Sequence, residues 1–283
     1  MFKRSVLALL LAVSATAPAL AQSDIRAALD TLDWKTAAVA YDLPGSNSVY
    51  SLNPGERLVL GKQARRYMAL MEGADAWPDV DAVVESQSGP TEGSFILIEY
   101  HEIGFLADDD WKDVASDTLL AEIVEATRQT NEVRRANGYP TLEVQGWVQE
   151  PYYSKRRNTV YWAIDVRDSR GFALINAVAM KLGRHGFSKL TWAGLREQFQ
   201  DAKMALGPAL RAYNFKEGAR YADFRDGDVI AAVGLGAMAM SLMTGNKRAF
   251  GGGILAGALV LLKKFWYVLL LPFLALGKLF RRS

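Results

Sequence analysis

The chain has 283 residues, a formal net charge of +2 and no cysteine, which excludes disulfide bonds, thiolate chemistry and cysteine-ligated metals. The charge is unevenly distributed. From Asp24 to Asp228 there are 24 lysines and arginines against 31 acids, a net charge of −7, whereas the residues after Asp228 carry seven basic side chains and no acid. The acidic main part argues against nucleic acid as a partner, and the basic, apolar tail indicates a membrane lipid bilayer.

Residues 1–21 have the pattern of a signal peptide. Two basic residues precede the apolar run Val6–Val13, and Ala19-Leu20-Ala21 is a small-residue cleavage site that gives a mature start at Gln22. An uncleaved signal anchor is the alternative, but the apolar run is short for a membrane span. We therefore expect an exported protein.

The N-terminal half of the mature chain mixes helical and strand patterns. In chain order we expect a helix over Gln22–Asp33, strands over Ala37–Tyr41 and Glu56–Leu60 around the turn-rich Pro44–Pro54, a helix over Lys62–Glu72, and a loop-like Gly73–Gly93 with a short strand at Ala82-Val83-Val84. Phe95–Tyr100 is apolar enough to be a central strand. It leads into an acidic loop, His101–Asp113.

The clearest pattern is a helix followed by a hairpin. Ser116 can cap a helix over Asp117–Asn137, which Asn137-Gly138 and Pro140 end. From Leu142 to Val166 the apolar period changes to two, which predicts two strands joined by a long loop, Glu150–Asn158, with Lys155-Arg156-Arg157 at its tip. On this pattern Trp147 and Tyr161 lie on the face opposite the valines and form a cross-strand pair.

The next segment predicts two further strands. Phe172–Leu182 and Phe187–Trp192 are joined by Gly183-Arg184-His185-Gly186, where the glycines allow the positive φ of a tight turn. Leu195–Tyr213 is helical in pattern until Gly207-Pro208 interrupts it. Strands and helices do not alternate regularly, so the expected fold class is α+β, a largely antiparallel sheet with packed helices, followed by a C-terminal transmembrane helix or helical hairpin.

Several motifs, in this order, resemble a known family. Asn131–Val166 contains N-E-x-R-R-x-N-G-Y-P-x-x-E-V-x-G-W-x-x-x-P-x-Y followed by V-Y-W-A, and Leu182–Gly186, Arg220–Phe224, the apolar tail and the acidic Gly104–Asp110 segment fit as well. Together they resemble the domain-of-unknown-function family 2167, uncharacterised membrane-anchored bacterial proteins. The resemblance covers roughly Tyr100 to the C-terminus. It implies a membrane anchor and an extracytoplasmic domain, and it brings no established reaction.

The tail contains three apolar blocks, Val229–Met243, Phe250–Leu262 and Phe265–Gly277. A helix over the first block would be roughly 23 Å long and, with its flanks, can just span a hydrocarbon core of about 30 Å. We expect a crossing there, with Lys247-Arg248 in the cytoplasm. Whether the third block returns as a hairpin stays open.

The expected organisation follows from these segments. Helical spans indicate the bacterial inner membrane, with the main domain in the periplasm. The chain divides into residues 1–21 as signal peptide, residues 22–228 as an extracytoplasmic α+β domain, and residues 229–283 as the membrane anchor.

No catalytic or metal-binding motif is complete. His101-Glu102 begins like a zinc-protease helix, but the second histidine would have to replace Phe105, so no metal site is predicted. Asp108-Asp109-Asp110 lacks the spacing of an EF-hand loop, and an exposed acidic loop is the simpler interpretation. Glu99, Glu102 and Asp108 are candidates for paired glycosidase carboxylates, whose separation the sequence does not give. No nucleophile elbow or phosphate-binding loop occurs, and no cofactor is expected.

Binding is the function that the sequence favours. Aromatic side chains can stack on a sugar or peptide, although sheet core is their alternative role, and a turn held by strands is a frequent site of function. The candidate ligand-binding residues are Tyr139, Trp147, Tyr152, Tyr153, Arg184 and His185. We expect a non-enzymatic envelope protein that binds or scaffolds something at the outer face of the inner membrane, with another envelope protein as a candidate partner. The alternatives are a hydrolase that acts on a cell-envelope substrate through carboxylates, and an accessory subunit of a membrane complex.

Overall fold

The computed structural model describes residues 22–72, 78–89, 91–136, 140–199 and 206–244. The predicted signal peptide, Tyr139 and the apolar blocks Phe250–Leu262 and Phe265–Gly277 lie outside the described residues.

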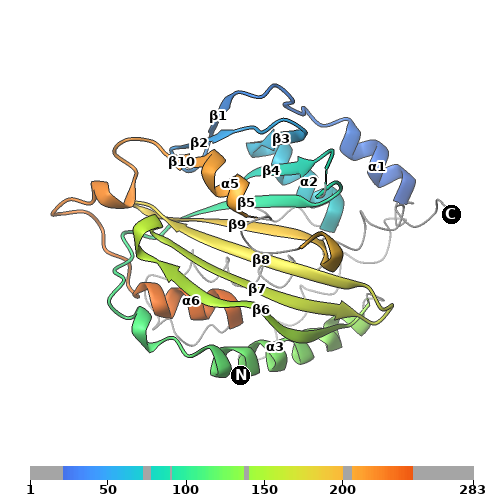
Figure 1. Ribbon diagram of the computed structural model, residues 1–283. Coiled ribbons are helices and arrows are strands. Elements are labelled where there is room, and N and C mark those ends of the chain that lie inside the picture. Colours follow the sequence, from blue (N-terminus) through green and yellow to red (C-terminus); the bar gives the residue numbers. More distant parts are fainter. Residues whose placement is uncertain (1–21, 73–77, 90, 137–139, 200–205, 245–283) are drawn as a thin grey trace, which may run out of the picture.

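Two antiparallel sheets form the body of the domain (Figure 1). The larger has seven strands in the order β3-β4-β5-β9-β8-β7-β6, and the smaller has three in the order β1-β2-β10. The strands of the large sheet are β3 (Glu56–Leu60), β4 (Val80–Ser86), β5 (Phe95–Glu102), β6 (Leu142–Ser154), β7 (Thr159–Asp168), β8 (Ala173–Leu182) and β9 (Gly186–Leu195). Those of the small sheet are β1 (Ala40–Leu43), β2 (Ser48–Ser51) and β10 (Tyr213–Phe215). The predicted α+β class with a largely antiparallel sheet is confirmed.

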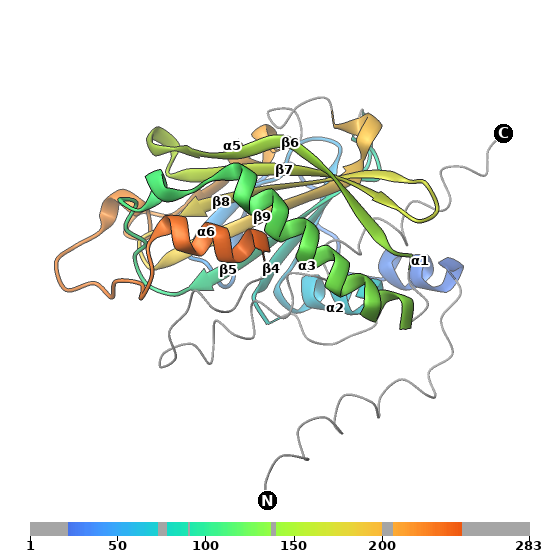
Figure 2. The same ribbon diagram turned by 90° about the horizontal axis from the view of Figure 1, so that it is seen from below.

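Helices cover one face of the large sheet, and the small sheet with one short helix covers the other. The α-helices are α1 (Gln22–Asp30), α2 (Gly61–Glu72), α3 (Ser116–Ala136), α5 (Gly207–Ala212) and α6 (Leu235–Thr244). Figure 2 shows α3 and α6 crossing one face of the sheet, which α2 also covers; we call it the helix face. The small sheet and α5 pack on the other, the small-sheet face. Residues two apart along a strand share a face, so successive side chains of β5 and β9 point alternately into the core on the helix face and the core on the small-sheet face.

The predicted elements are largely where the patterns put them. The helix Asp117–Asn137 is α3, the strand Glu56–Leu60 is β3, and the turn Gly183–Gly186 joins β8 to β9. Phe95–Tyr100 lies in β5, an interior strand. Its partners are β4 and the distant β9, a pairing that periodicity does not reveal.

Three local predictions are wrong. The turn-rich Pro44–Pro54 contains β2, and the predicted loop Glu150–Asn158 is mostly strand, with only the short 3₁₀ turn η2 (Lys155–Arg157) and a left-handed Asn158 between β6 and β7. Where the helix over Leu195–Tyr213 was predicted, the described residues begin with the end of β9 and the 3₁₀ turn Arg196–Gln198, and Gly207-Pro208, the predicted interruption, begins α5. Proline at a first helical position suits the fixed φ of its ring.

The predicted Trp147–Tyr161 pair is also wrong. Gly146 has φ +141° at a register shift in β6, and further shifts follow before Tyr152. Each extra residue in a bulge moves the following side chains to the other face. Trp147 therefore opposes Ile164 on the helix face, and the partner of Tyr161 is Tyr152.

The structure places the predicted membrane crossing Val229–Met243 differently. Residues 229–234 run past the loop that follows β5, and α6 is ten residues long with Leu235, Ala239 and Leu242 buried against the helix face. A helix of that length covers about 15 Å, half of a hydrocarbon core of about 30 Å. No helix in the described part of the chain has the length and apolarity needed to cross a bilayer. An apolar run of this length suits a core helix as well as a short span, which is why the sequence did not distinguish them.

Candidate functional site

The loop after β5 holds the segment that leads into α6. The Phe105 amide donates to the Val229 carbonyl at 2.8 Å, the Ala231 amide donates to the Phe105 carbonyl at 2.9 Å, and the Leu235 amide donates to the Ala107 carbonyl at 2.8 Å. Gly104 has φ +93°, and a Cβ atom there would lie 2.7 Å from the Val229 carbonyl oxygen. Only glycine permits this close approach of two backbones.

Asp110 fastens the start of α6. Its Oδ1 accepts the Gly236 amide at 2.8 Å and its Oδ2 accepts the Ala237 amide at 3.0 Å. These amides lie in the first turn of the helix, where N–H groups have no partner within the helix and the dipole favours a negative charge. The acidic loop is therefore a capping device for a helix 126 residues away in the sequence.

Replacing Asp110 with alanine should release α6. We expect the loss of two charged hydrogen bonds to cost about 1–2 kcal/mol of unfolding free energy. Urea denaturation of the full-length protein in detergent measures this loss. Asp109 is the matched control, because it is exposed and Asp109→Ala should change stability by less than about 0.5 kcal/mol. Equal losses in the two variants would contradict the capping role.

Arg184 ties the residues before this segment to the β8–β9 turn. Its guanidinium donates to both carboxylate oxygens of Asp228 at 2.7 Å, a two-bond pairing that orients both groups. These hydrogen bonds from Arg184 lower the pKa of Asp228 to about 2. The Tyr221 hydroxyl donates to the Leu106 carbonyl at 2.7 Å, and its ring stacks on Phe105 with centroids 4.5 Å apart.

The hairpin reaches the same place. The Tyr153 hydroxyl donates to Asp108 Oδ2 at 3.1 Å, Lys155 lies 3.4 Å from the same oxygen, and Trp147 Nε1 donates to the Ser116 carbonyl at 3.3 Å. The acidic loop, the hairpin and the Arg184 turn are far apart in the sequence, and they meet around residues 218–238. These residues include the Arg220–Phe224 run.

A cleft of about 1190 Å³ opens beside this meeting point. Its apolar wall is formed by Ile103, Val229, Ala231, Val233 and Met238. The lining also carries charges of both signs, from Lys62, Arg65, Asp79, Asp81 and Glu102. The cleft is therefore amphipathic, and one wall belongs to the segment that the motif residues hold in place.

A family model confirms the family resemblance that the motifs of the sequence indicated. A model described as "Protein of unknown function (DUF2167)" matches residues 35–274. The chain belongs to the DUF2167 family.

Other comparisons add little to this assignment. No match was found among curated proteins. Among solved structures, the DUF2167 chain is similar to the cyanobacterial PsbP (CyanoP) of Synechocystis sp. PCC 6803, with 14% identity and a TM-score of 0.39, covering 64% of this chain and 94% of the other. A likeness this weak carries no functional argument.

The charged groups of the cleft differ in how they are held. Asp81 is buried; its carboxylate accepts the Gly45 amide at 2.8 Å and the Ser46 hydroxyl at 2.5 Å. Burial raises the pKa of this carboxyl. Burial, with the nearby charge of Glu102, also raises the pKa of Tyr100, another lining residue, to about 12. Asp81 therefore helps to fasten the β1–β2 turn, whereas Glu102 is exposed to the cleft.

The three candidate hydrolytic carboxylates of the DUF2167 chain have separate environments. Glu99 is buried on the helix face in an ion pair with Lys189, Glu102 lines the cleft, and Asp108 binds Tyr153. Within the described residues, no three His, Asp or Glu side chains gather in a way that would hold a metal ion.

The predicted binding residues also lie in different environments. His185 lines the cleft, whereas Trp147, Tyr153 and Arg184 make the structural contacts described above. Tyr152 lies away from the cleft, 59% exposed on the small-sheet face. The residues that sequence reasoning missed, Lys62, Arg65, Asp79 and Asp81, follow no motif, and only the fold brings them together.

Proposed function

We propose that this DUF2167 chain is a non-enzymatic binding protein of the bacterial cell envelope, and that a peptide-like ligand occupies the cleft. The observation that carries this proposal is the amphipathic lining described above. At about 1190 Å³ the cleft exceeds the roughly 300–1,000 Å³ of ordinary small-molecule sites, which suits an extended ligand. A peptide offers both apolar side chains and charges of both signs to such a lining.

The location of the protein belongs to the same proposal. The signal-peptide pattern and the basic, apolar residues after 244 support a domain held at the outer face of the inner membrane. Because the chain has no cysteine, a single introduced one is a unique label site. Glu132→Cys on α3, with a side chain 69% exposed, should react with a membrane-impermeant maleimide in intact spheroplasts. Reaction only after lysis would place the domain in the cytoplasm and overturn the location.

Ligand capture tests the cleft. Ala232 is an exposed residue of the apolar side, and an Ala232→Cys variant can carry a photo-crosslinker. We expect irradiated cells to yield a peptide-bearing adduct from position 232. Arg135→Cys, on the exposed surface of α3, is the matched control and should yield none. Equal adducts at the two positions, or none at either, would count against a cleft ligand.

One observation favours a hydrolase as the second candidate. A carboxyl in a cleft with a raised pKa, as at Asp81, is typical of a general acid. The two hydrogen bonds to Asp81 favour a structural role instead. The exposed Glu102 distinguishes the two functions. If the cleft is catalytic, the original protein should release hydrolysis products from envelope material and Glu102→Gln should not. If the cleft only binds, neither protein should release products above the background level.

A further inference from the structure

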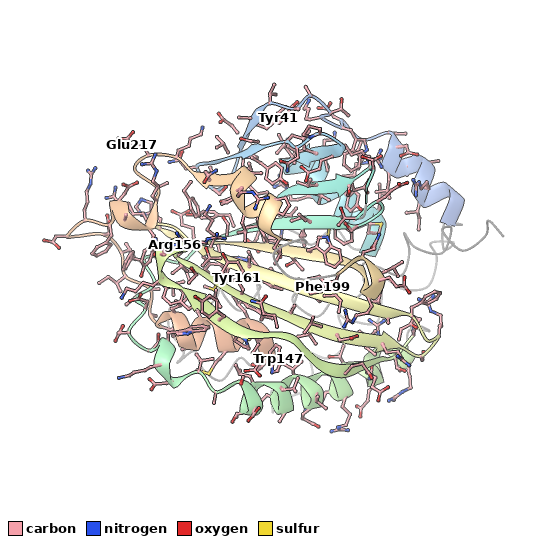
Figure 3. The ribbon with its side chains drawn as sticks, in the orientation of Figure 1. Tyr41, Trp147, Arg156, Tyr161, Phe199 and Glu217 are labelled. Carbon is pink, nitrogen blue, oxygen red and sulfur yellow. The ribbon has the colours of Figure 1, made fainter. Side chains whose placement is uncertain are left out.

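A second exposed feature lies on the small-sheet face, away from the cleft. Tyr152 on β6 and Tyr161 on β7 are cross-strand partners, with ring centroids 6.5 Å apart and planes inclined by 23°. Tyr152 is 59% exposed, the highest value for an aromatic side chain in the described chain, while Tyr161 is partly buried against the core of that face. Figure 3 looks onto this face and shows Tyr161 with Arg156 at the end of the same hairpin.

Cations surround one end of the pair. Lys181 lies on β8 two residues beyond Ala179, the cross-strand partner of Tyr161, and so shares its face. Its Nζ donates to the Tyr213 carbonyl at 2.6 Å, and it is close enough to Arg157 for the two charges to repel. Arg156 and Arg157 are exposed, and neither forms an ion pair with an acid of the described residues. The end of the aromatic pair is thus positively charged.

One polar atom here lacks a partner. The Tyr161 hydroxyl is buried and makes no hydrogen bond with another of the described residues. Leaving such a group unpaired costs about 1–3 kcal/mol, so a ligand recovers this loss if the Tyr161 ring turns its hydroxyl towards the surface on binding. A phenol can donate to, or accept from, a sugar hydroxyl.

We propose that the Tyr152–Tyr161 pair and its flanking cations bind an anionic glycan. A tyrosine ring presents a rigid apolar face for the C–H face of a sugar ring. The cations Lys181, Arg156 and Arg157 supply complementary charge for a carboxylate or other acidic group, and the Tyr161 hydroxyl supplies a hydrogen-bond partner. An anionic lipid surface fits less well, because Tyr161 and Lys181 are partly buried on a sheet face and a flat bilayer would reach only the hairpin tip.

Binding of a defined oligosaccharide to the full-length protein in detergent tests this proposal. The probe is an oligogalacturonate, and a neutral maltooligosaccharide of equal length is its control. We expect calorimetric binding of the oligogalacturonate alone. Tyr152→Ala should weaken it roughly tenfold, the equivalent of one aromatic stacking contact. Arg157→Ala should weaken it and reduce its salt dependence.

Two further comparisons separate binding from folding. Tyr161→Phe should weaken binding several-fold without lowering thermal stability, because it removes only the unpaired hydroxyl. Val124→Ala and Arg135→Ala, both on the exposed surface of α3, should leave binding unchanged. Equal binding of the neutral oligosaccharide, no binding at all, or full affinity in Tyr152→Ala would each overturn the proposal. So would equal losses in the α3 controls.

Discussion

Replacing Lys189 with methionine is expected to lower the free energy of unfolding by about 3–5 kcal/mol. Lys189 on β9 faces Glu99 on β5 in the middle of the large sheet, and the two form an ion pair with side chains only 2% and 5% exposed. Without the lysine, the Glu99 carboxylate keeps its burial and loses the charge that compensates it. Urea denaturation of the full-length protein in detergent, monitored by tryptophan fluorescence, measures the loss.

The double variant Lys189→Met with Glu99→Leu is the informative companion. Apolar side chains of similar volume remove both charges, so we expect stability within about 2 kcal/mol of the original protein, or above it. The two single losses should therefore not add. A double variant as unstable as Lys189→Met alone would show that the carboxylate is not the source of the loss. The lysine stem would then be needed for packing.

Gly186→Ala is expected to separate β5 from β9 at the end of their pairing, at a cost of more than about 4 kcal/mol of unfolding free energy. Gly186 has φ +154°, and a Cβ atom there would collide with the His101 carbonyl oxygen. Neither atom belongs to a flexible side chain, so the β5–β9 backbones must separate. Circular dichroism during thermal unfolding measures the effect.

Gly171→Ala is the control for conformational strain alone. Gly171 also has a positive φ, +93°, but a Cβ atom there would meet nothing within 4 Å. A left-handed conformation without collision should cost about 1–2 kcal/mol. If Gly186→Ala were no worse than Gly171→Ala, the two strands would be free to adjust, and the close approach would not explain the glycine.

Local patterns were a good guide to the individual elements. The 3.6-residue period and end signals of α3, and the two-residue period of β7, depend on neighbours within a few residues. The same patterns failed where a distant partner decided the outcome. Nothing near Gly146 reveals the bulges that turn Trp147 towards the helix face, and the apolar Val229–Met243 does not show whether protein or lipid will cover it.

The candidate site was less accessible to sequence reasoning than the fold. The Gly104–Asp110, Leu182–Gly186 and Arg220–Phe224 motifs were visible, but not that they meet around one segment. Arg184 drew attention as a binding residue and proved to hold Asp228. The charged residues that line the cleft come from α2, β5 and the region at the start of β4, and they follow no common pattern.

Periodicity and end signals were enough to derive the α+β class and most of the helices and strands, and the ordered motifs carried the resemblance to the family. These properties depend on short-range backbone preferences and on which side chains avoid water. The pairing of β5 with β9, the burial of the Glu99–Lys189 pair, the capping of α6 by Asp110 and the cleft all arose from the tertiary structure. Each joins residues that are distant in the chain, and their pairing is chosen by the packing of the whole domain, because a buried charge or helix end needs a partner that only the folded chain brings near.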